Sequence, residues 1–494
     1  MTSAHVSLTF LQLNDLHGQL FPHAELFWQR GTPLIKQNIG GIARIATFLR
    51  TRKQQDPDRT FIADCGDAFF GSYFTQIDQG AALLPFLNAL GIDASNGGHW
   101  EYYYGPERFL ELARALNYPL YALNVYKKGT RTRIFPPYGI FEKAGVKIAV
   151  LGLAATIVDD SMPASFAGNL EFTDGIAADE LPALLPEVRA QADLICLISH
   201  MGLPQDIAIA QGNPGIDIIF SGHTHDRLWQ PAVVTGGNEP YGDTLLISAG
   251  FSGSFIGELQ LQLERTPSGR LHKQFSYRLH VIDESIPEDS TVQQQLDTLL
   301  EQHKATLTPT LGTVTTDLHR MLTFESTMDN FLLLCMQNTY RADLYVSRAW
   351  RFCPPKPKGV LTEQDLWDMV PFQVQLFEAH ITGLELRAAV EKWLTNVMTT
   401  PLSQKGGYVT RQLGMHVIAR INNPDGYRVQ EIEIGGKPLD LTMKYHVIIA
   451  GEQVKKDFLA NWTPLPQDLH TVVRSALAKG PIHSPLTHDK FIIS

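Results

Sequence analysis

Residues 218–225 read Ile-Ile-Phe-Ser-Gly-His-Thr-His, an apolar stretch that ends in two histidines. Apolar residues followed by Ser-Gly are typical of a buried strand that ends in a tight turn. Residues i and i+2 of an extended backbone point to the same side, so His223 and His225 would direct both imidazoles toward one place. Because imidazole is a common metal ligand, this stretch predicts a metal site at the carboxyl end of a strand.

The same arrangement recurs at other places in the first half of the chain. Strand-like segments at 8–14, 60–63, 94–96 and 192–199 are each followed by carboxylates or histidines. Open α/β sheets bind ligands at the carboxyl ends of their strands. The predicted metal ligands are Asp15, His17, Asp67, His99, His200, His223 and His225. Seven donors are too many for one tetrahedral ion, so we expect two cations that share a bridging carboxylate, for which Asp67 is the candidate.

The order of elements indicates an α/β protein with more than one domain. Strand-like segments alternate with amphipathic stretches such as 41–50 and 106–116, which favours layers of helices on sheets. Residues 291–304 have helical spacing without Gly or Pro, and we interpret them as a linker helix. A chain of 494 residues exceeds what one core supports. We expect a catalytic domain at 1–285, a linker at 286–309 and a C-terminal domain at 310–494.

Composition and charge exclude several classes of protein. Hydrophobic residues make up 44% of the chain and charged residues 19%, as in ordinary globular domains. The formal net charge of -10 argues against a nucleic acid polymer as partner, because such partners require a basic surface. The four cysteines, Cys65, Cys196, Cys335 and Cys353, lack CxxC spacing, which argues against a disulfide framework or a thiolate zinc site.

The start of the chain and its apolar runs bear on its location. Residues 1–7 leave no room for the apolar region of a signal peptide, because strand-like sequence begins at Leu8. The longest apolar run, 148–158, is too short to span a bilayer, so we expect no membrane association. As written, the chain is expected in the cytoplasm, or in the periplasm if a leader has been removed. The oligomeric state stays open.

The ordered motifs resemble those of the dinuclear metallophosphoesterases. They are Asp15-Leu16-His17, Gly66-Asp67, Gly98-His99-Trp100-Glu101, His200 and Gly222-His223-Thr224-His225. Gly40-Gly41-Ile42-Ala43-Arg44 and Pro371-Phe372 narrow the resemblance to the 5′-nucleotidase family. It implies a four-layer β-sandwich flanked by helices, followed by a C-terminal α/β substrate domain. It also implies a metal-bridging hydroxide that attacks phosphorus or sulfur in an ester-like group.

The chain departs from the nucleotidases of this family at the third motif. They carry Gly-Asn-His-Glu followed by an Asp, whereas here His99 stands at the Asn, Trp100 at the catalytic His and Tyr103 at the Asp. An indole cannot replace an imidazolium as a proton donor at neutral pH. The catalytic candidates are therefore Asp67, His99 and Trp100, with Arg351 from the second half of the chain.

The expected nucleoside-binding residues are incomplete as well. Where nucleotidases have an Asn-Gly-Gly-x-x-Arg-like segment, residues 346–351 keep only Arg351, and Phe324 replaces an Arg. The Gly-Gly-Asp-Gly-aromatic loop is replaced by 452–456, so Phe372 is the one stacking wall that remains. Such a site should bind nucleosides poorly, because stacking and hydrogen bonding carry that specificity.

These departures resemble the bacterial sulfur-oxidation thiosulfohydrolase (SoxB) branch of the family. The matching pieces are Gly-His-Trp-Glu, the segment 347–352 and Gly406-Gly407-Tyr408-Val409-Thr410-Arg411. The branch uses two manganese ions to release sulfate from an S-sulfonated cysteine on a carrier protein's flexible tail. The resemblance implies Arg351, Phe372, Tyr408 and Arg411 as substrate-binding residues, with guanidinium groups that hold the anion or the tail.

Three hypotheses for the activity follow. The first is a thiosulfohydrolase-like hydrolase with two divalent cations, Mn favoured by resemblance and Zn, Fe or Co possible for imidazole and carboxylate donors. Its partner would be a small anionic substrate or an S-sulfonated carrier tail. The second is a 5′-nucleotidase or related nucleotide phosphatase. The third is a catalytically idle docking protein that binds metal.

Overall fold

The chain divides into two compact units. The computed structural model describes residues 5–236, 242–265, 271–488 and 490–493. The first unit comprises 1–23 and 38–299, and the second comprises 24–37 and 300–494. The boundary falls within the long helix α9 (Ser290–Leu307), where a linker helix was expected at 291–304. No helix among the described residues is long and apolar enough to cross a bilayer.

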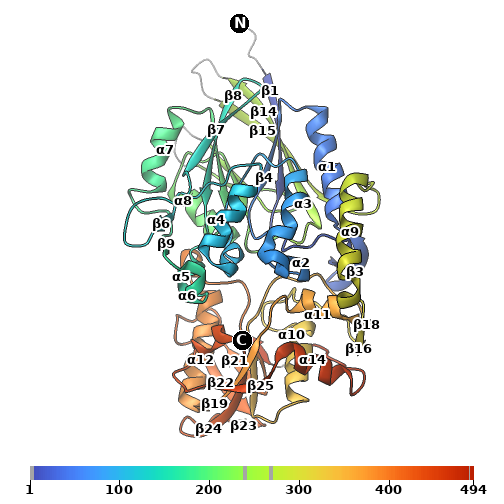
Figure 1. The fold of residues 1–494 in the computed structure, drawn as a ribbon. Helices are drawn as coiled ribbons and strands as arrows, with labels where there is room; N and C mark the ends of the chain where they lie inside the picture. The colour runs from blue at the N-terminus through green and yellow to red at the C-terminus, as the bar shows by residue number, and fades with distance from the viewer. Residues whose placement is uncertain (1–4, 237–241, 266–270, 489, 494) are drawn as a thin grey trace. The chain divides into compact units, whose positions relative to one another are not determined.

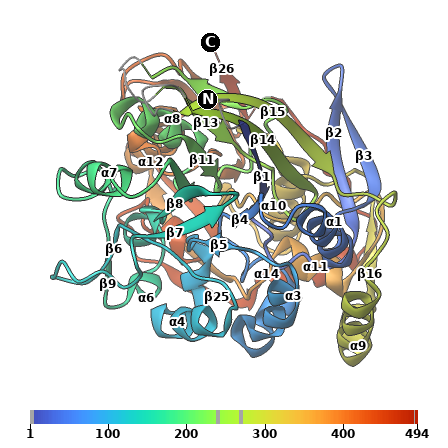
Figure 2. The same cartoon turned by 90° about the horizontal axis from the view of Figure 1, so that it is seen from above.

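The first unit contains two large sheets (Figures 1 and 2). One has the order β15 (Leu271–Val281), β14 (Phe255–Arg265), β1 (His5–Leu13), β4 (Thr60–Asp64), β5 (Ala94–Ser95). The other has the order β12 (Ala232–Val234), β13 (Thr244–Ile247), β11 (Ile218–Ser221), β10 (Leu194–Ser199), β8 (Val146–Leu153), β7 (Tyr138–Lys143). Within each sheet the central strands, β1–β4–β5 and β8–β10–β11–β13, are parallel, so their carboxyl ends meet at one edge.

The two sheets pack face to face around one apolar core. Phe10 and Phe61 of the first sheet lie in the same buried cluster as Val150, Ile198 and Phe220 of the second. The opposite face of the second sheet packs in another cluster against α7 (Leu181–Arg189) and α8 (Leu203–Gly212). Helix α1 (Ile42–Gln55) packs against β4 of the first sheet. Two sheets between outer helices are the four layers that the family resemblance implies.

Alternation along the strands explains this layering. Ile148 and Val150 of β8 enter the core between the sheets, whereas Ala149 and Leu151 of the same strand enter the cluster under α7 and α8. A parallel strand that is buried on both faces must be apolar at every position, as this stretch is. The shorter elements of the unit are α2 (Tyr73–Gln76), α3 (Leu84–Ala89), α4 (Pro106–Ala115), α5 (Ile157–Asp160), α6 (Ala164–Ala167), β6 (Val125–Lys127) and β9 (Leu170–Phe172).

The second unit is an α/β domain with its own core. Its larger sheet has the order β20 (Arg411–Leu413), β17 (Leu344–Ser347), β24 (Lys444–Ala450), β19 (Gln375–Thr382), β25 (Thr463–Asp468). A second sheet has the order β23 (Lys437–Pro438), β22 (Val429–Ile434), β21 (Met415–Ala419), β26 (Phe491–Ile493). One apolar cluster joins both sheets to α12 (Gly383–Met398), which includes the buried Trp393.

Capping residues set the starts of the helices in this unit. Thr362 is the N-cap residue of α11 (Glu363–Met369), and Thr382 is the N-cap residue of α12. Each forms a reciprocal capping box with the acidic residue three positions later. Ser326 caps α10 (Thr327–Gln337) by accepting a hydrogen bond from Asp329 N. The remaining elements are β16 (Thr310–Val314), β18 (Gly359–Thr362), α13 (Glu452–Lys455), α14 (Leu469–Leu477), and the pair β2 (His23–Gln29) and β3 (Thr32–Ile39).

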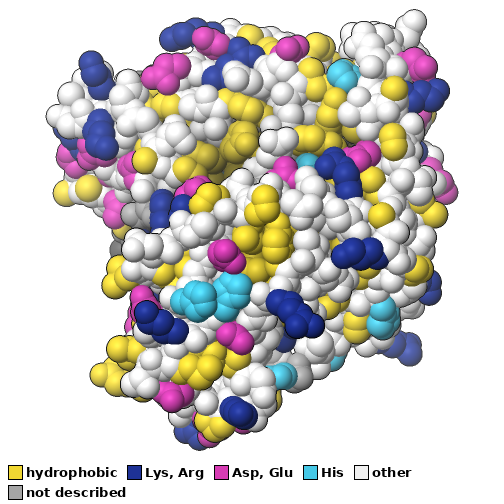
Figure 3. All heavy atoms as spheres, turned by 60° about the horizontal axis from the view of Figure 1, so that its bottom comes forward, with side chains coloured by type: hydrophobic (Ala, Val, Ile, Leu, Met, Phe, Trp, Pro, Cys, Tyr) yellow, Lys and Arg dark blue, Asp and Glu magenta, His cyan; other side chains and the backbone are white. Residues whose placement is uncertain are grey.

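One face of the molecule shows how charge is distributed. In Figure 3, acidic and basic side chains are interspersed across the visible surface, and neither sign forms a large continuous area there. Apolar side chains on this face occur as separate patches between them. This mixed pattern is ordinary for a globular protein whose formal net charge is -10.

Candidate metal centre

All seven predicted ligands follow the carboxyl ends of parallel strands. Asp15 and His17 come after β1, Asp67 after β4 and His99 after β5. His200 directly follows β10, and His223 and His225 follow β11. Backbone hydrogen bonds join the first two loops, since Asp15 N donates to Gly66 O over 3.0 Å and His17 N to Asp67 O over 2.8 Å.

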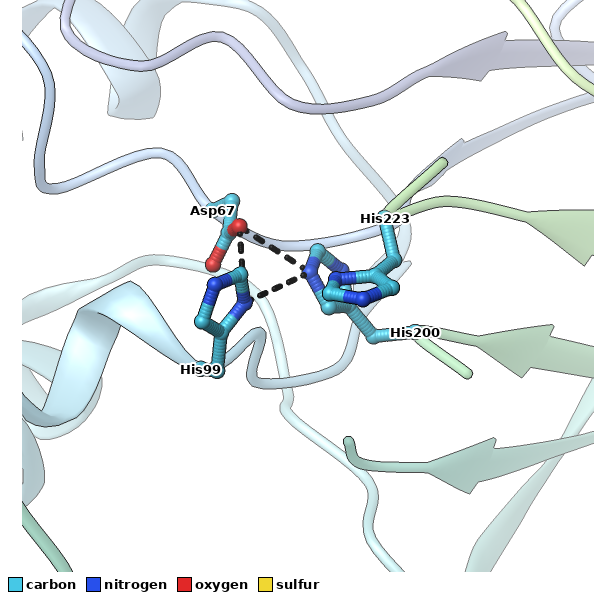
Figure 4. Close-up of side chains that lie close together, drawn as sticks. All are labelled: Asp67, His99, His200 and His223. Carbon is cyan, nitrogen blue, oxygen red and sulfur yellow. Dashed lines mark hydrogen bonds and ion pairs between the residues drawn. The ribbon is translucent and has the colours of Figure 1, made fainter. Parts of the chain in front are cut away.

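The structure brings these side chains into two buried groups. Asp67, His99, His200 and His223 form one, and Asp15, His17 and His225 form the other, each with its donor atoms within 4.8 Å of one another. Figure 4 shows the first group, in which the three imidazoles converge on the Asp67 carboxylate. Asp15 Oδ1 lies 3.9 Å from His200 Nε2 and 3.3 Å from His225 Nε2, so the two groups are neighbours.

The spacing of the donors fits shared cations. Asp67 Oδ2 lies 3.1 Å from His99 Nδ1 and 3.1 Å from His200 Nε2, yet this oxygen has no well-directed hydrogen bond. The His17 and His225 Nε2 atoms lie 3.1 Å apart. Ligand atoms about 2.1 Å from one cation lie roughly 3.0–3.5 Å from each other at ordinary coordination angles. The donors are thus spaced as ligands around a common centre.

Hydrogen bonds to backbone carbonyls orient two of the imidazoles. His17 Nδ1 lies 2.9 Å from Phe70 O, and His200 Nδ1 lies 2.5 Å from Cys65 O. A carbonyl can only accept, so each Nδ1 carries a proton and Nε2 is the nitrogen that faces the site. A metal ion would bind at Nε2, where it would take the place of any proton.

The backbone at the ligands adopts a conformation that side chains usually avoid. Five of the seven ligands have positive φ: Asp15 (50°), His17 (50°), Asp67 (52°), His223 (71°) and His225 (60°). Each costs free energy and persists only where the surrounding structure enforces it. Their concentration at this edge of the sheets indicates that the fold is strained in order to place ligands.

Burial and mutual charge shift the pKa values of the ligands strongly. Burial lowers the pKa of His17 to about 4. Burial would also lower the pKa of His200, but Asp67 and Asp15 raise it to about 10. For Asp67, burial opposes ionisation, but His200 and His99 hold its pKa well below the usual range. Buried carboxylates therefore favour positive charge beside them, which bound cations supply.

Comparison with known protein families agrees with this geometry. Residues 8–227 match the calcineurin-like phosphoesterase family, and residues 306–453 match the 5′-nucleotidase C-terminal domain. The chain belongs to the 5′-nucleotidase family of metallophosphoesterases. It is therefore a hydrolase of the superfamily whose motifs the sequence contains, with a candidate dinuclear metal site.

Individual relatives of this metallophosphoesterase are named for different activities. The chain is 24% identical to 5′-nucleotidase of Mus musculus over 99% of its own length and 90% of the relative. It is 23% identical to the trifunctional nucleotide phosphoesterase YfkN of Bacillus subtilis, over 77% of the chain but only 28% of that longer relative. Among solved structures, sulfate thiohydrolase SoxB of Thermus thermophilus matches with a TM-score of 0.87 and 25% identity, over 98% of this chain and 96% of that one.

Residues outside the predicted ligand set support the segments that carry two of the predicted ligands. Asp206 in α8 accepts hydrogen bonds from Ser199 Oγ and Ser221 Oγ, both over 2.5 Å. These serines stand immediately before His200 and two residues before His223. Sequence reasoning missed Asp206, because an acid in the first turn of a helix is common and nothing in the sequence signals its partners.

Two further contacts near the ligands also escaped the sequence analysis. Asn14 Nδ2 donates to Asp15 Oδ2 over 2.7 Å and to Gly250 O over 2.6 Å. Gly98 lies against Asp67 so closely that a Cβ atom there would overlap its Oδ1. The positions of Asn14 beside Asp15, and of Gly98 beside His99, were the available signals.

Trp100 packs as part of an aromatic wall beside the ligands. Its ring stacks on Phe70 with centroids 4.3 Å apart and an interplanar angle of 5°. Tyr103 also contacts Phe70, with centroids 4.4 Å apart, and His99 lies 5.2 Å from the Trp100 ring. The Trp100 backbone N–H donates to Asp67 Oδ1 over 2.9 Å. The residue therefore orients the Asp67 carboxylate through its backbone and lines the site with an apolar ring.

Three of the predicted substrate residues lie in the C-terminal domain as partly buried side chains. Phe372 lies edge-on to Trp350, with ring centroids 5.5 Å apart. A Cβ atom on Gly407 would lie 3.2 Å from Arg351 Nη1, so the Arg351 side chain passes close to the segment that contains Tyr408. The two motifs that the sequence analysis grouped are thus neighbours, as the β17–β20 pairing of Ser347 with Arg411 requires.

Arg411 has surroundings that do not suit the predicted substrate role. The side chain is 1% exposed. Its Nε donates to Asp329 Oδ2 over 2.8 Å, Nη1 to Thr323 O over 2.9 Å and Nη2 to Leu322 O over 2.7 Å. All three nitrogens are occupied within the fold, so Arg411 holds the domain together, and the anion-binding role assigned to it from the sequence requires correction.

Proposed function

We propose that this metallophosphoesterase is thiosulfohydrolase-like, releasing sulfate from an S-sulfonated thiol. The observation that carries the proposal is Trp100, an apolar ring at the position where family nucleotidases have a proton donor. A thiolate leaves with a pKa near 8.5 and needs little help from an acid, whereas a ribose alkoxide needs much more. The likeness to SoxB over 98% of the chain also supports a thiosulfohydrolase-like activity.

The reaction proposed is the hydrolysis of RS–SO₃⁻ by water to RSH, SO₄²⁻ and H⁺. A sulfur–oxygen bond forms and the sulfur–sulfur bond breaks, with no change that requires a redox partner. Two divalent cations, Mn by preference, would supply Lewis acidity and activate the attacking water. Asp15, His17, Asp67 and His225 would hold one cation, and Asp67, His99, His200 and His223 the other.

The residues of this chain have separate tasks in that reaction. The Nδ1 contacts of His17 and His200 with backbone carbonyls leave Nε2 as the atom that would bind a cation, and the Trp100 N–H fixes the Asp67 carboxylate, which both cations would share. The stacked rings of Trp100 and Phe70 exclude water from one side of it. Arg351 supplies a guanidinium suited to a sulfonate or to the main chain of a carrier-protein tail, which is the proposed partner.

Nucleotide hydrolysis is the second candidate, because curated relatives of similar length carry the name 5′-nucleotidase. A direct comparison separates the two. We would measure sulfate release from a peptide with an S-sulfonated cysteine and phosphate release from AMP, both with Mn²⁺. We expect kcat/KM for the peptide to exceed that for AMP by at least about a hundredfold, the effect of about 2.7 kcal/mol in the transition state.

A variant of Trp100 sharpens this test. Trp100→His restores the side chain of the nucleotidases and should raise turnover of AMP relative to that of the S-sulfonated peptide. Faster turnover of AMP than of the peptide by the unmodified chain would overturn the proposal in favour of a nucleotidase. Turnover of neither substrate by the Mn²⁺-loaded chain would favour the idle docking protein.

A further inference from the structure

One histidine of the candidate metal centre is oriented differently from two others. His17 and His200 are each held by a contact between Nδ1 and a backbone carbonyl. Among the residues that the structure describes, the His225 side chain makes polar contacts through Nε2 alone, at 3.3 Å from Asp15 Oδ1 and 3.1 Å from His17 Nε2. A metal-binding imidazole ordinarily has a second partner that fixes the orientation of its ring. Another kind of contact must therefore orient the ring of His225.

The ring of Phe251 lies flat against this imidazole. The centroids of the Phe251 and His225 rings are 4.7 Å apart, and the angle between the ring planes is 7°. By comparison, the ring contacts of His200 with His99 and His223 have interplanar angles of 46° and 61°. Flat rings in contact at such a centroid distance are offset, which is a favoured arrangement of aromatic side chains. The stack fixes the plane of the His225 ring.

The Phe251 ring is itself held firmly. Its side chain is fully buried, and it lies in the segment 248–252 between β13 and β14. Backbone hydrogen bonds join this segment to the residues that directly follow His225, as in the bond from Gly250 N to Asp226 O over 2.8 Å. The two stacked rings are therefore carried by neighbouring, hydrogen-bonded stretches of backbone.

The same segment is also bonded to the loop that carries Asp15. Ser252 N donates to Asp15 O over 2.8 Å. The side chain of Asn14 links the two as well, because its Nδ2 donates to Gly250 O over 2.6 Å and its Oδ1 accepts from Ala249 N over 3.1 Å. One short segment thus supports both loops that supply neighbouring ligands of this group, which fixes their positions relative to each other.

We propose that Phe251 is a positioning residue of the metal centre. Its ring holds the His225 imidazole in the plane in which Nε2 faces Asp15 and His17. An imidazole that is already oriented loses less freedom when it binds a cation, so the stack should raise the affinity of this ligand group. The other group, which contains His223, should not depend on Phe251.

The inference rests on the metal centre of the proposed function, but not on which substrate is hydrolysed. Its test is therefore the affinity for metal, measured apart from turnover. A ring that only filled the core would contribute to the stability of the fold and leave metal affinity unchanged. A ring that positions a ligand should change metal affinity, and should do so only while that ligand is present.

The experiment is isothermal titration of the full-length, metal-free chain with MnCl₂. Phe251→Leu keeps a buried apolar side chain but removes the stacked ring. We expect it to weaken one of the two Mn²⁺ sites about tenfold or more, as is typical when the partner behind a metal ligand is changed, and to leave the other site as it was. Phe61→Leu removes an equally buried ring from the core between the sheets, and should lower thermal stability without changing either affinity.

A double-mutant cycle shows whether Phe251 acts through His225. In a His225→Ala background the ring has no imidazole to hold, so adding Phe251→Leu should weaken Mn²⁺ binding no further. A second loss of about tenfold in that background would overturn the positioning role.

The remaining outcomes separate this inference from the proposed function. If Phe251→Leu fails to fold, Phe251→Met takes its place in both backgrounds, because it fills a similar volume without a ring. Equal Mn²⁺ affinities in the unmodified chain and in the Phe251 variant would overturn the inference and leave the metal centre standing. Fewer than two Mn²⁺ ions bound by the unmodified chain would instead contradict the metal centre of the proposed function.

Discussion

Each unit of the molecule buries a group of charged side chains, and the two groups differ in how their charge is satisfied. In the C-terminal domain, Asp329 lies between Arg320 and Arg411, and backbone carbonyls accept the remaining guanidinium hydrogens. In the catalytic domain, Asp67 Oδ2 lies among imidazoles without a well-directed hydrogen bond. The charges of the first group are compensated by other groups of the same domain. The second group presents metal-ligand atoms to an ion that the chain itself does not supply.

This comparison teaches how to separate structural from functional charge. Both groups are buried, so burial alone does not distinguish them. The backbone does, since Asp15, Asp67 and three histidines of the metal centre have positive φ, whereas Asp329 sits in the first turn of a capped helix. Strain together with unsatisfied acceptors marks the functional group.

The largest expected effect comes from removing the shared carboxylate. Asp67→Ala should lower turnover by on the order of ten-thousandfold, because each of the two cations would lose a ligand. Thermal unfolding should change far less than activity. Asp58→Ala, which removes an exposed acid of the same unit, serves as the control. Retention of more than a tenth of the activity in Asp67→Ala would contradict a bridging role.

The matched change in the other group should affect stability instead. Asp329→Asn leaves Arg320 and Arg411 buried without a counter-ion, so the free energy of unfolding should fall by about 3–5 kcal/mol. Urea denaturation followed by circular dichroism measures this, and metal content should not change. Asp425→Asn, which removes the exposed partner of Arg428, should lower the free energy of unfolding far less, because water screens the charge of an exposed carboxylate. An equal loss of unfolding free energy in Asp329→Asn and Asp425→Asn would contradict the view that Asp329 is a structural counter-ion.

A smaller effect is expected at the residue that supports two ligands. Asp206→Asn weakens the hydrogen bonds from Ser199 and Ser221, so Mn²⁺ affinity should fall about tenfold to a hundredfold, as is typical when the partners behind metal ligands are changed. Isothermal titration with MnCl₂ measures the affinity. Asp174→Asn, at an exposed position of the same unit, should leave it unchanged. An unchanged Mn²⁺ affinity in Asp206→Asn would show that Asp206 does not support the metal ligands.

The smallest effect concerns the pH dependence of stability. It involves Glu325, a carboxylate of the C-terminal domain whose hydrogen-bond partners lie in the same domain. Burial opposes ionisation of Glu325, but hydrogen bonds from Asn330, Thr487 and His488 lower its pKa below the usual 4.5. Its stabilisation is therefore present above pH 4.5 and lost as pH falls through the lowered pKa. Glu325→Gln should cost about 1 kcal/mol at pH 7 and less below pH 4. A difference that grows toward acid pH would have the wrong sign.

The grouping of the seven predicted ligands can be anticipated from the sequence for a physical reason. Each ligand lies within four residues of the end of an apolar strand, and parallel strands bring their carboxyl ends to one edge, so local patterns determine which side chains meet. His223 and His225 lie side by side in sequence and converge with Asp15, which is more than 200 residues away, because β1 and β11 both deliver their ends to the same place. The helix predicted at 291–304 is likewise a local pattern, and α9 contains it.

The parts that sequence reasoning missed depend on long-range partners. Nothing around Arg411 reveals that it pairs with Asp329, which lies 82 residues earlier, so a buried structural arginine was taken for a substrate ligand. Asp206 resembles an ordinary acid at the start of a helix until its serine partners are seen.

The central claim is that seven side chains from five strand ends hold two cations. Equilibrium dialysis of the full-length chain against MnCl₂, followed by elemental analysis, counts the bound ions directly. The account predicts two manganese ions per chain in the unmodified protein, and at most one after His223→Ala, with the Asp15, His17 and His225 group left intact. Fewer than two tightly bound ions in the unmodified protein, or two that persist in His223→Ala, would contradict it.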